Sequence, residues 1–206
     1  MRFFFVAMLF IIWYNTAMTT AEEMFIKGNV KDAFEIFLSL AQQGDGRAMY
    51  FLALYYALGL GDIDYPDDVI AGKLLKKGSK AGDILAKLNT AFAFEPESHA
   101  FIDIVNETFD KVKDLADSGD IFAQNEMADL YMNGWGTKKD VDRGLSILKS
   151  CSEKGLWLSS YRLAQYYDSL GTQEGQNESM RWLYKAADQG CQKAEAVIKV
   201  MELLSD

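Results

Sequence analysis

The chain has 206 residues, half of them apolar, which is enough for one or two domains with a sizeable buried core. Acidic side chains outnumber basic ones by 30 to 21, and the formal net charge is −9. This balance argues against nucleic-acid binding, because no stripe of cations is present to neutralise phosphates, and against docking on an anionic membrane surface. A field of this sign steers in a basic protein partner, although an acidic balance also serves solubility alone.

Residues 1–21 have the three parts of a secretory signal peptide. Arg2 gives a positive start, Phe3–Tyr14 is an apolar run, and small residues end the segment at Ala21. The run is shorter than the ~20 residues that span a membrane, so we expect cleavage after Ala21 and no integral span in the mature chain. The sequence thus predicts an exported protein, periplasmic in a bacterium and secreted or in the lumen of the endoplasmic reticulum otherwise. An uncleaved anchor is the alternative.

Five glycines recur along the chain at spacings of 38, 37, 36 and 35 residues. They are Gly44, Gly82, Gly119, Gly155 and Gly190. A small residue follows four positions after each of them. Such a period is typical of stacked helix pairs, because a lone pair cannot bury its apolar face and small residues let helices approach closely. The predicted fold is all-α, an α-solenoid of about ten helices in antiparallel pairs.

Residues 22–206 form one predicted solenoid domain. Its predicted parts are a half unit at 22–43, units at 44–81, 82–118, 119–154 and 155–189, and a terminal helix at 190–206. The first helix of the half unit is expected to be missing or reduced to Glu22–Lys27. Unit 82–118 is divergent, because AFAFEPESHAF replaces its glycine turn. The terminal helix is expected to cap the array with a polar outer face, as end repeats do.

Residues 131–144, YMNGWGTKKDVDRG, and residues 181–190, RWLYKAADQG, carry the pattern most clearly. Together with YALGLGDIDYPDDVIAG at 56–72 they resemble the Sel1-like repeat, a relative of the tetratricopeptide repeat. The resemblance covers residues 30–206. It implies a helical scaffold that binds other proteins and seldom carries out chemistry.

The resemblance also implies where a protein partner binds, since the first helix of each pair usually lines the concave face of such an array. Six side chains off the packing stripe of these helices, and Trp135 in a glycine turn, are the predicted contacts. The seven are Arg47, Phe51, Phe122, Asp129, Arg162, Tyr166 and Trp135. They mix charge with aromatic rings, as the centre of an interface does. A narrower alternative is an exported immunity protein that neutralises a toxin. The oligomeric state stays open.

The sequence contains no nucleophile elbow, P-loop, dinucleotide-binding fingerprint or zinc-ligand cluster, so we predict no enzyme, cofactor or metal. The one histidine, His99, has no nucleophile or carboxylate at motif spacing. The aspartates at 62–68 do not follow the EF-hand spacing, and Asp67 or Asp68 is expected to cap the next helix. Interaction with β-lactams, which cysteine-rich relatives suggest, is a further alternative, but Ser152–Lys154 lacks the S-x-x-K spacing. A secretory adaptor is the alternative in a eukaryote.

Two cysteines, Cys151 and Cys191, are the candidates for a disulfide. An even number in an exported protein favours a bridge. The repeat register opposes it, because a whole helix pair should separate the two residues, while a disulfide needs Cα atoms within about 7 Å. Both alternatives stay open here. In the unbridged one, Cys151 is a small core residue aligned with Ala186.

Overall fold

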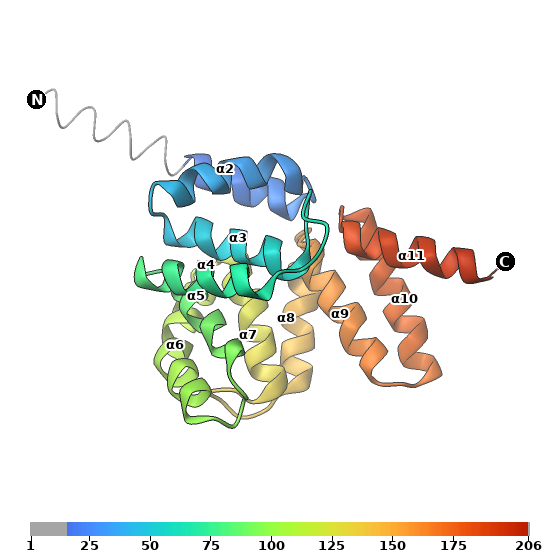
Figure 1. Ribbon diagram of the computed structural model, residues 1–206. Coiled ribbons are helices and arrows are strands. Elements are labelled where there is room, and N and C mark those ends of the chain that lie inside the picture. The colour runs from blue at the N-terminus through green and yellow to red at the C-terminus, as the bar shows by residue number, and fades with distance from the viewer. Residues whose placement is uncertain (1–15, 206) are drawn as a thin grey trace, which may run out of the picture.

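The computed structural model describes residues 16–205, and within that range it consists of helices without a β-strand. A helix over residues 16–26 is followed by α2 (Val30–Gln42), α3 (Gly46–Leu58), α4 (Asp68–Lys80), α5 (Ile84–Asn89), the 3-10 turn η1 (Thr90–Ala93), α6 (His99–Asp117), α7 (Ile121–Asn133), α8 (Val141–Glu153), α9 (Trp157–Ser169), α10 (Gln173–Asp188) and α11 (Gln192–Ser205). Successive helices pack in antiparallel pairs that stack into a curved array (Figure 1). The predicted all-α solenoid is therefore confirmed. Most of the predicted signal peptide, residues 1–15, lies outside the described residues.

A glycine–aspartate step starts the first helix of three units. Asp45, Asp83 and Asp120 cap α3, α5 and α7, and each accepts a hydrogen bond from the backbone N–H three residues on, at 2.5 to 2.8 Å. The glycine before each aspartate has a φ between 93° and 105°, where a side chain would be strained. Glycine therefore reverses the chain after one helix, and aspartate starts the next. The recurring glycine–aspartate pair thus explains the repeat period seen in the sequence.

The first helix of the half unit is neither missing nor reduced to residues 22–27, because its helical part begins earlier in the chain. Residues 16–26 are helical, and Ala21 and Phe25 are fully buried. The centroid of the Phe25 ring lies 5.4 Å from that of Phe51, 5.8 Å from that of Phe122 and 5.2 Å from that of Trp157. Those three rings come from α3, α7 and α9. One helix near the start of the chain thus joins units that are far apart in sequence.

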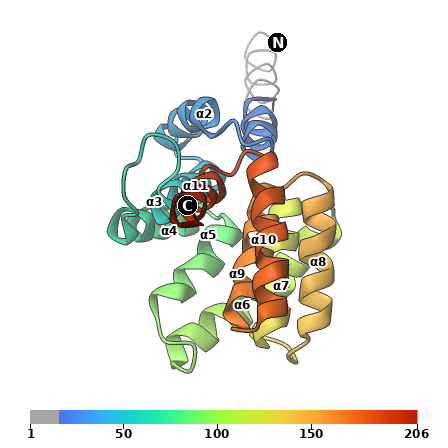
Figure 2. The same ribbon diagram turned by 90° about the vertical axis from the view of Figure 1, so that its right-hand side faces the viewer.

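The beginning and the end of the array touch. The indole N–H of Trp157 donates a hydrogen bond of 2.7 Å to the backbone carbonyl of Phe25. Gly28 and Gly190 lie so close that a Cβ on Gly28 would fall 2.5 Å from the Cα of Gly190. Figure 2 shows the start of the described chain beside the connection from α10 to α11. The curved array is therefore closed by direct contact of segments more than 150 residues apart.

The divergent unit differs from the others in its first helix. α5 has six residues before it gives way to η1, whereas α3, α7 and α9 have 13 each. The side chains of Asn89 and Thr90 donate to backbone carbonyls of α5 at 2.9 and 2.7 Å, which competes with continuation of the helix. Pro96 then disfavours a helical conformation of the residue before it. The short segment leaves Phe92 and Phe94 exposed.

Candidate protein-interaction surfaces

Arg47, one of the predicted partner-binding residues, joins three elements of the array. Its guanidinium donates to Glu22 Oε1 at 2.9 Å and to Asp120 Oδ2 at 2.8 Å. It also lies 5.2 Å from the ring centroid of Phe51 and 5.4 Å from that of Phe122. Burial opposes the charge, but the two carboxylates outweigh it and raise the pKa of Arg47. The side chain is 14 % exposed, so little of it is free to contact a partner.

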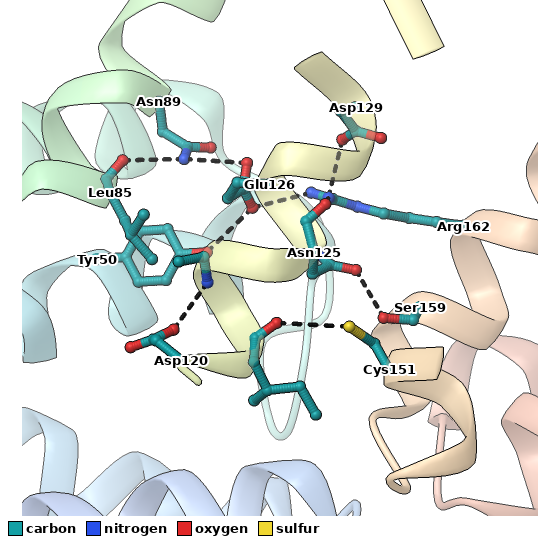
Figure 3. Close-up of polar contacts among 12 residues, drawn as sticks. Tyr50, Leu85, Asn89, Asp120, Asn125, Glu126, Asp129, Cys151, Ser159 and Arg162 are labelled. Atoms are coloured by element: carbon teal, nitrogen blue, oxygen red, sulfur yellow. Dashed lines mark hydrogen bonds and ion pairs between the residues drawn. The ribbon is translucent and has the colours of Figure 1, made fainter. Parts of the chain in front are cut away.

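Arg162 of α9 is held by α7 in a similar way (Figure 3). It donates to Asp129 Oδ2 at 2.8 Å, to Glu126 Oε1 at 3.2 Å and to the backbone carbonyl of Asn125 at 3.0 Å. Glu126 is buried, and the Tyr50 hydroxyl of α3 donates to the same oxygen at 3.1 Å. Breaking a buried ion pair leaves an uncompensated charge, so this network resists separation of α7 from α9.

Asp129 is a carboxyl group of this network whose pKa departs from its usual value. Burial raises the pKa of Asp129 to about 6, Arg162 lowers it, and the neighbouring Glu126 raises it further. The Arg162 guanidinium thus pairs with two carboxylates of α7, those of Glu126 and Asp129. The network contains a carboxyl group that titrates well above the ordinary range of aspartate.

Two of the predicted partner-binding aromatics are core residues. Phe51 and Phe122 are 0 % and 1 % exposed, and their rings pack edge to face with centroids 4.7 Å apart. The expectation that they lie off the packing stripe is wrong, because helix 16–26 covers the inner face and places Phe25 against both. The sequence signal for that helix is Ala21 and Phe25, four residues apart on one helical face.

Tyr166 and Trp135 keep part of their surface in contact with solvent. Tyr166 packs against Tyr167, with ring centroids 5.4 Å apart. Trp135 packs against Phe101 at 5.0 Å and against Phe92 at 5.6 Å, so the glycine turn of one unit contacts the divergent unit before it. Partner binding by the seven predicted residues stays a prediction.

Both cysteines are free, buried thiols. The Sγ of Cys151 lies 3.7 Å from Gln124 Oε1 and 3.9 Å from the backbone oxygen of Ile121. Burial raises the pKa of both thiols. The structure thus holds no bridge between Cys151 and Cys191, and Cys151 occupies a core position, as the unbridged alternative predicts.

α11 has an uncovered apolar face. Val200, Leu203 and Leu204 are 56 %, 78 % and 82 % exposed. The prediction of a polar outer face for the helix at 190–206 is therefore wrong. α11 projects from the array and packs mainly on α10, and within residues 16–205 no further helix lies over its outer face (Figure 1).

A cavity of about 660 Å³ opens beside this face, between α9, α10 and α11. Its apolar lining includes Tyr161, Ala164, Met180, Leu183, Val197 and Met201. Asp168 is the charged residue of the lining. The size is within the range of sites that hold an organic ligand or several partner side chains.

The residues that the sequence analysis considered for catalysis or metal binding lie apart in the structure. His99 is exposed at the first residue of α6, and Asp67 caps α4 by accepting from the Ile70 N–H at 2.9 Å. Over residues 16–205 there is no group of three side chains suited to hold a metal ion. The same stretch contains no helix that combines the length and the apolar character needed to cross a membrane.

The model of the Sel1 repeat matches residues 46–83, 121–156 and 157–191, just over half of the chain. The chain belongs to the Sel1-repeat family. Each match spans one helix pair of this Sel1-repeat protein: α3 with α4, α7 with α8, and α9 with α10. The helices of the divergent unit, the short α5 and α6, lie outside the matches.

Several solved structures are similar to this Sel1-repeat protein. A Sel1-repeat protein from Klebsiella pneumoniae has 16% identity and a TM-score of 0.49, with 92% of this chain and 93% of that chain covered. A Sel1-repeat protein from Oxalobacter formigenes has 21% identity and a TM-score of 0.41, with 87% and 73% covered. The immunity protein Pa5087 from Pseudomonas aeruginosa has 20% identity and a TM-score of 0.41, with 88% and 68% covered. No curated protein matches the chain.

Proposed function

We propose that this Sel1-repeat protein is a scaffold with no reaction of its own, which binds a helix of another protein at the α11 end of the array. The observation that carries the proposal is the uncovered apolar face of α11 beside the cavity of about 660 Å³. Contiguous exposed apolar surface of this kind marks interaction sites. The predicted concave site is less suited, because helix 16–26 and the aromatic core fill the inner face around Phe25.

The α11 surface fits an amphipathic helix. Val197, Val200, Met201 and Leu204 follow the spacing i, i+3, i+4, i+7, which forms one stripe along α11. α3, α7 and α9 each pack against the second helix of their own pair, whereas α11 has no such helix within residues 16–205. A partner helix laid on the stripe takes that place. The carboxylate of Asp168 and the net charge of −9 favour a basic helix.

Export is part of the proposal and is supported by the signal-like residues 1–21. Cleavage after Ala21 keeps Glu22 and Phe25 in the mature chain. Those two side chains make the ion pair to Arg47 and the aromatic contacts at the centre of the core. A cleaved protein therefore retains these contacts, while it loses residues 16–21 of the helix and with them the buried Ala21. In a bacterium its location is the periplasm, where an immunity protein would meet an incoming toxin.

The test is a quantitative pull-down from the cell envelope with three forms of the tagged full-length protein. They are the wild type, the double variant Val200→Asp with Leu204→Asp, and the control Lys199→Asp. The control changes the charge of α11 at a polar position. We expect the wild type and the control to retain one stoichiometric partner. The double variant should recover less than about a tenth of that amount, because buried apolar anchors dominate such interfaces.

Three results would contradict the proposal. One is equal loss of the partner from the control and the double variant, which indicates a charge effect. Another is full retention by the double variant while circular dichroism shows all three proteins folded. The third concerns export: intact protein that still begins at Met1 and fractionates away from the periplasm contradicts cleavage and export.

A further inference from the structure

Two adjoining cavities follow one another along α6, α7 and α8. The first, of about 310 Å³, has an apolar floor that includes Ala116, Met127 and Ile147. The second, of about 300 Å³, lies at the turn before α8. Both are lined by Tyr131 and Arg143, so the two cavities adjoin at these residues. Five cations line the two cavities, which we together term the basic groove: Lys113, Lys138, Lys139, Arg143 and Lys154.

The charge of the basic groove is opposite to that of the whole chain. Its lining contains two carboxylates against the five cations. Asp117 pairs with Lys113 at 2.6 Å, and Asp140 caps α8 by accepting from the backbone N–H of Arg143 at 3.0 Å. An acidic chain with a net charge of −9 thus concentrates positive charge on one surface. Such a patch attracts an anionic group while the remaining surface repels it.

Arg143 is the residue that most distinguishes the groove. Arg47 and Arg162 are each paired with two carboxylates. Within residues 16–205 no carboxylate lies in ion-pair range of Arg143, whose guanidinium carbon sits 3.9 Å from the ring centroid of Tyr131. Stacking on an aromatic ring holds a guanidinium in place and leaves its edge donors available to a carboxylate.

Lys154 is positioned on the opposite side of the apolar floor. Its ammonium donates to Gln124 Oε1 at 3.0 Å, and the Gln124 amide in turn donates to the carbonyl of Ala116 at 3.0 Å. The lysine is therefore oriented by an amide and its charge is not neutralised by that contact. Two held cations and an apolar floor between them match a ligand that carries carboxylates on both sides of an apolar side chain.

We propose that the basic groove binds an extended acidic segment of a partner protein, with an apolar side chain on the α6–α8 floor and carboxylates on Arg143 and Lys154. The inference rests on the proposed scaffold function for the class of its ligand, and its surface is separate from the α11 face. Charge complementarity selects the acidic segment. The cavity volume admits side chains of a peptide without any movement of the helices.

The test is a fluorescence anisotropy titration with a labelled peptide in which glutamates flank a single leucine. It uses the full-length wild type, Arg143→Gln, and the matched control Lys149→Gln. Lys149 is exposed on the same helix α8 and does not line the basic groove. We expect Arg143→Gln to weaken the peptide about tenfold and Lys149→Gln less than about twofold, because a charge-assisted contact is lost only in the first.

A second peptide, with glutamates alone, tests the apolar floor and should bind more weakly than the one with leucine. Equal weakening by Arg143→Gln and Lys149→Gln would overturn the proposal, as would equal affinity for the two peptides or no binding of either. Self-association of the protein that Arg143→Gln abolishes would assign the groove to a second copy and also overturn it. The Val200→Asp with Leu204→Asp variant should bind the peptide normally, so failure at α11 and failure at the groove are distinguishable.

Discussion

The two ends of the repeat array meet the same physical problem in opposite ways. An outermost repeat has a face without a neighbour, because each unit buries its apolar surface against the next. At the start, helix 16–26 lies across the inner face and buries Phe25 among rings from three units. At the other end, α11 leaves Leu203 and Leu204 exposed. Residues outside the repeat pattern thus determine whether an end is closed or available for binding.

Removal of the Phe25 ring is the most direct test of the difference between the two ends. We expect Phe25→Ala to lower the free energy of unfolding by about 3–5 kcal/mol, because the cavity would lie among fully buried rings. Leu204→Ala is the control, and at 82 % exposure it should change stability by less than about 0.5 kcal/mol. Urea denaturation followed by circular dichroism measures both. Similar small effects would mean that helix 16–26 is not part of the stable fold.

The contact between the two ends is tested by a pair of glycines. Gly28 and Gly44 both have positive φ, at 75° and 93°, so alanine costs about 1–2 kcal/mol at either. At Gly28 the new Cβ also meets the Gly190 backbone at 2.5 Å, whereas at Gly44 nothing lies within 4 Å. Gly28→Ala should therefore destabilise by a further 1–3 kcal/mol or so, the usual cost of overpacking. Equal melting temperatures for the two variants would argue against a tight closure.

The smallest expected effect is a pH dependence of stability caused by Asp129 on the inner face. The pKa of Asp129 is about 6 in the folded protein and about 3.9 in an unfolded chain. Between about pH 4 and pH 6 the Asp129 carboxyl is protonated in the folded protein and ionised in the unfolded chain. The contribution of Asp129 to stability is therefore fully present below about pH 4 and is lost as the pH rises through about 6. A difference of two pKa units corresponds to about 3 kcal/mol, and because 29 % of the Asp129 side chain is exposed to solvent, we expect the wild type to lose about 1–2 kcal/mol over that range relative to Asp129→Asn. Parallel pH profiles for the two proteins, measured by urea denaturation, would contradict a buried, shared ion pair.

The middle of the array could be predicted from the sequence, because its determinants are local and repeated. The glycine–aspartate steps at Gly44, Gly82 and Gly119 fix where one helix ends and the next begins, and both residues act within a few positions of the chain. The family resemblance rests on another set of local signals, chiefly the glycine turns within residues 56–72 and 131–144. Local signals of this kind need no knowledge of the tertiary structure.

The inner face could not be predicted in this way. Arg47 meets Asp120 across 73 residues, and Arg162 meets Glu126 across 36, so no spacing motif shows that the charges are paired. Phe51 and Phe122 are buried against each other and against Phe25, which lies far from both in the sequence. α11 differs in the opposite sense, because Leu203 and Leu204 are exposed although end repeats usually present a polar outer face.

The contact of Gly28 with Gly190 has a consequence for how such a protein can change over evolutionary time. An open array tolerates gain or loss of one unit, since each unit touches only its neighbours. Here an added helix pair between α4 and α9 would move Gly190 from Gly28 and Trp157 from Phe25. The number of repeats is thus fixed by the circumference that the first helix can bridge, and duplication of a single unit would open the molecule instead of lengthening it.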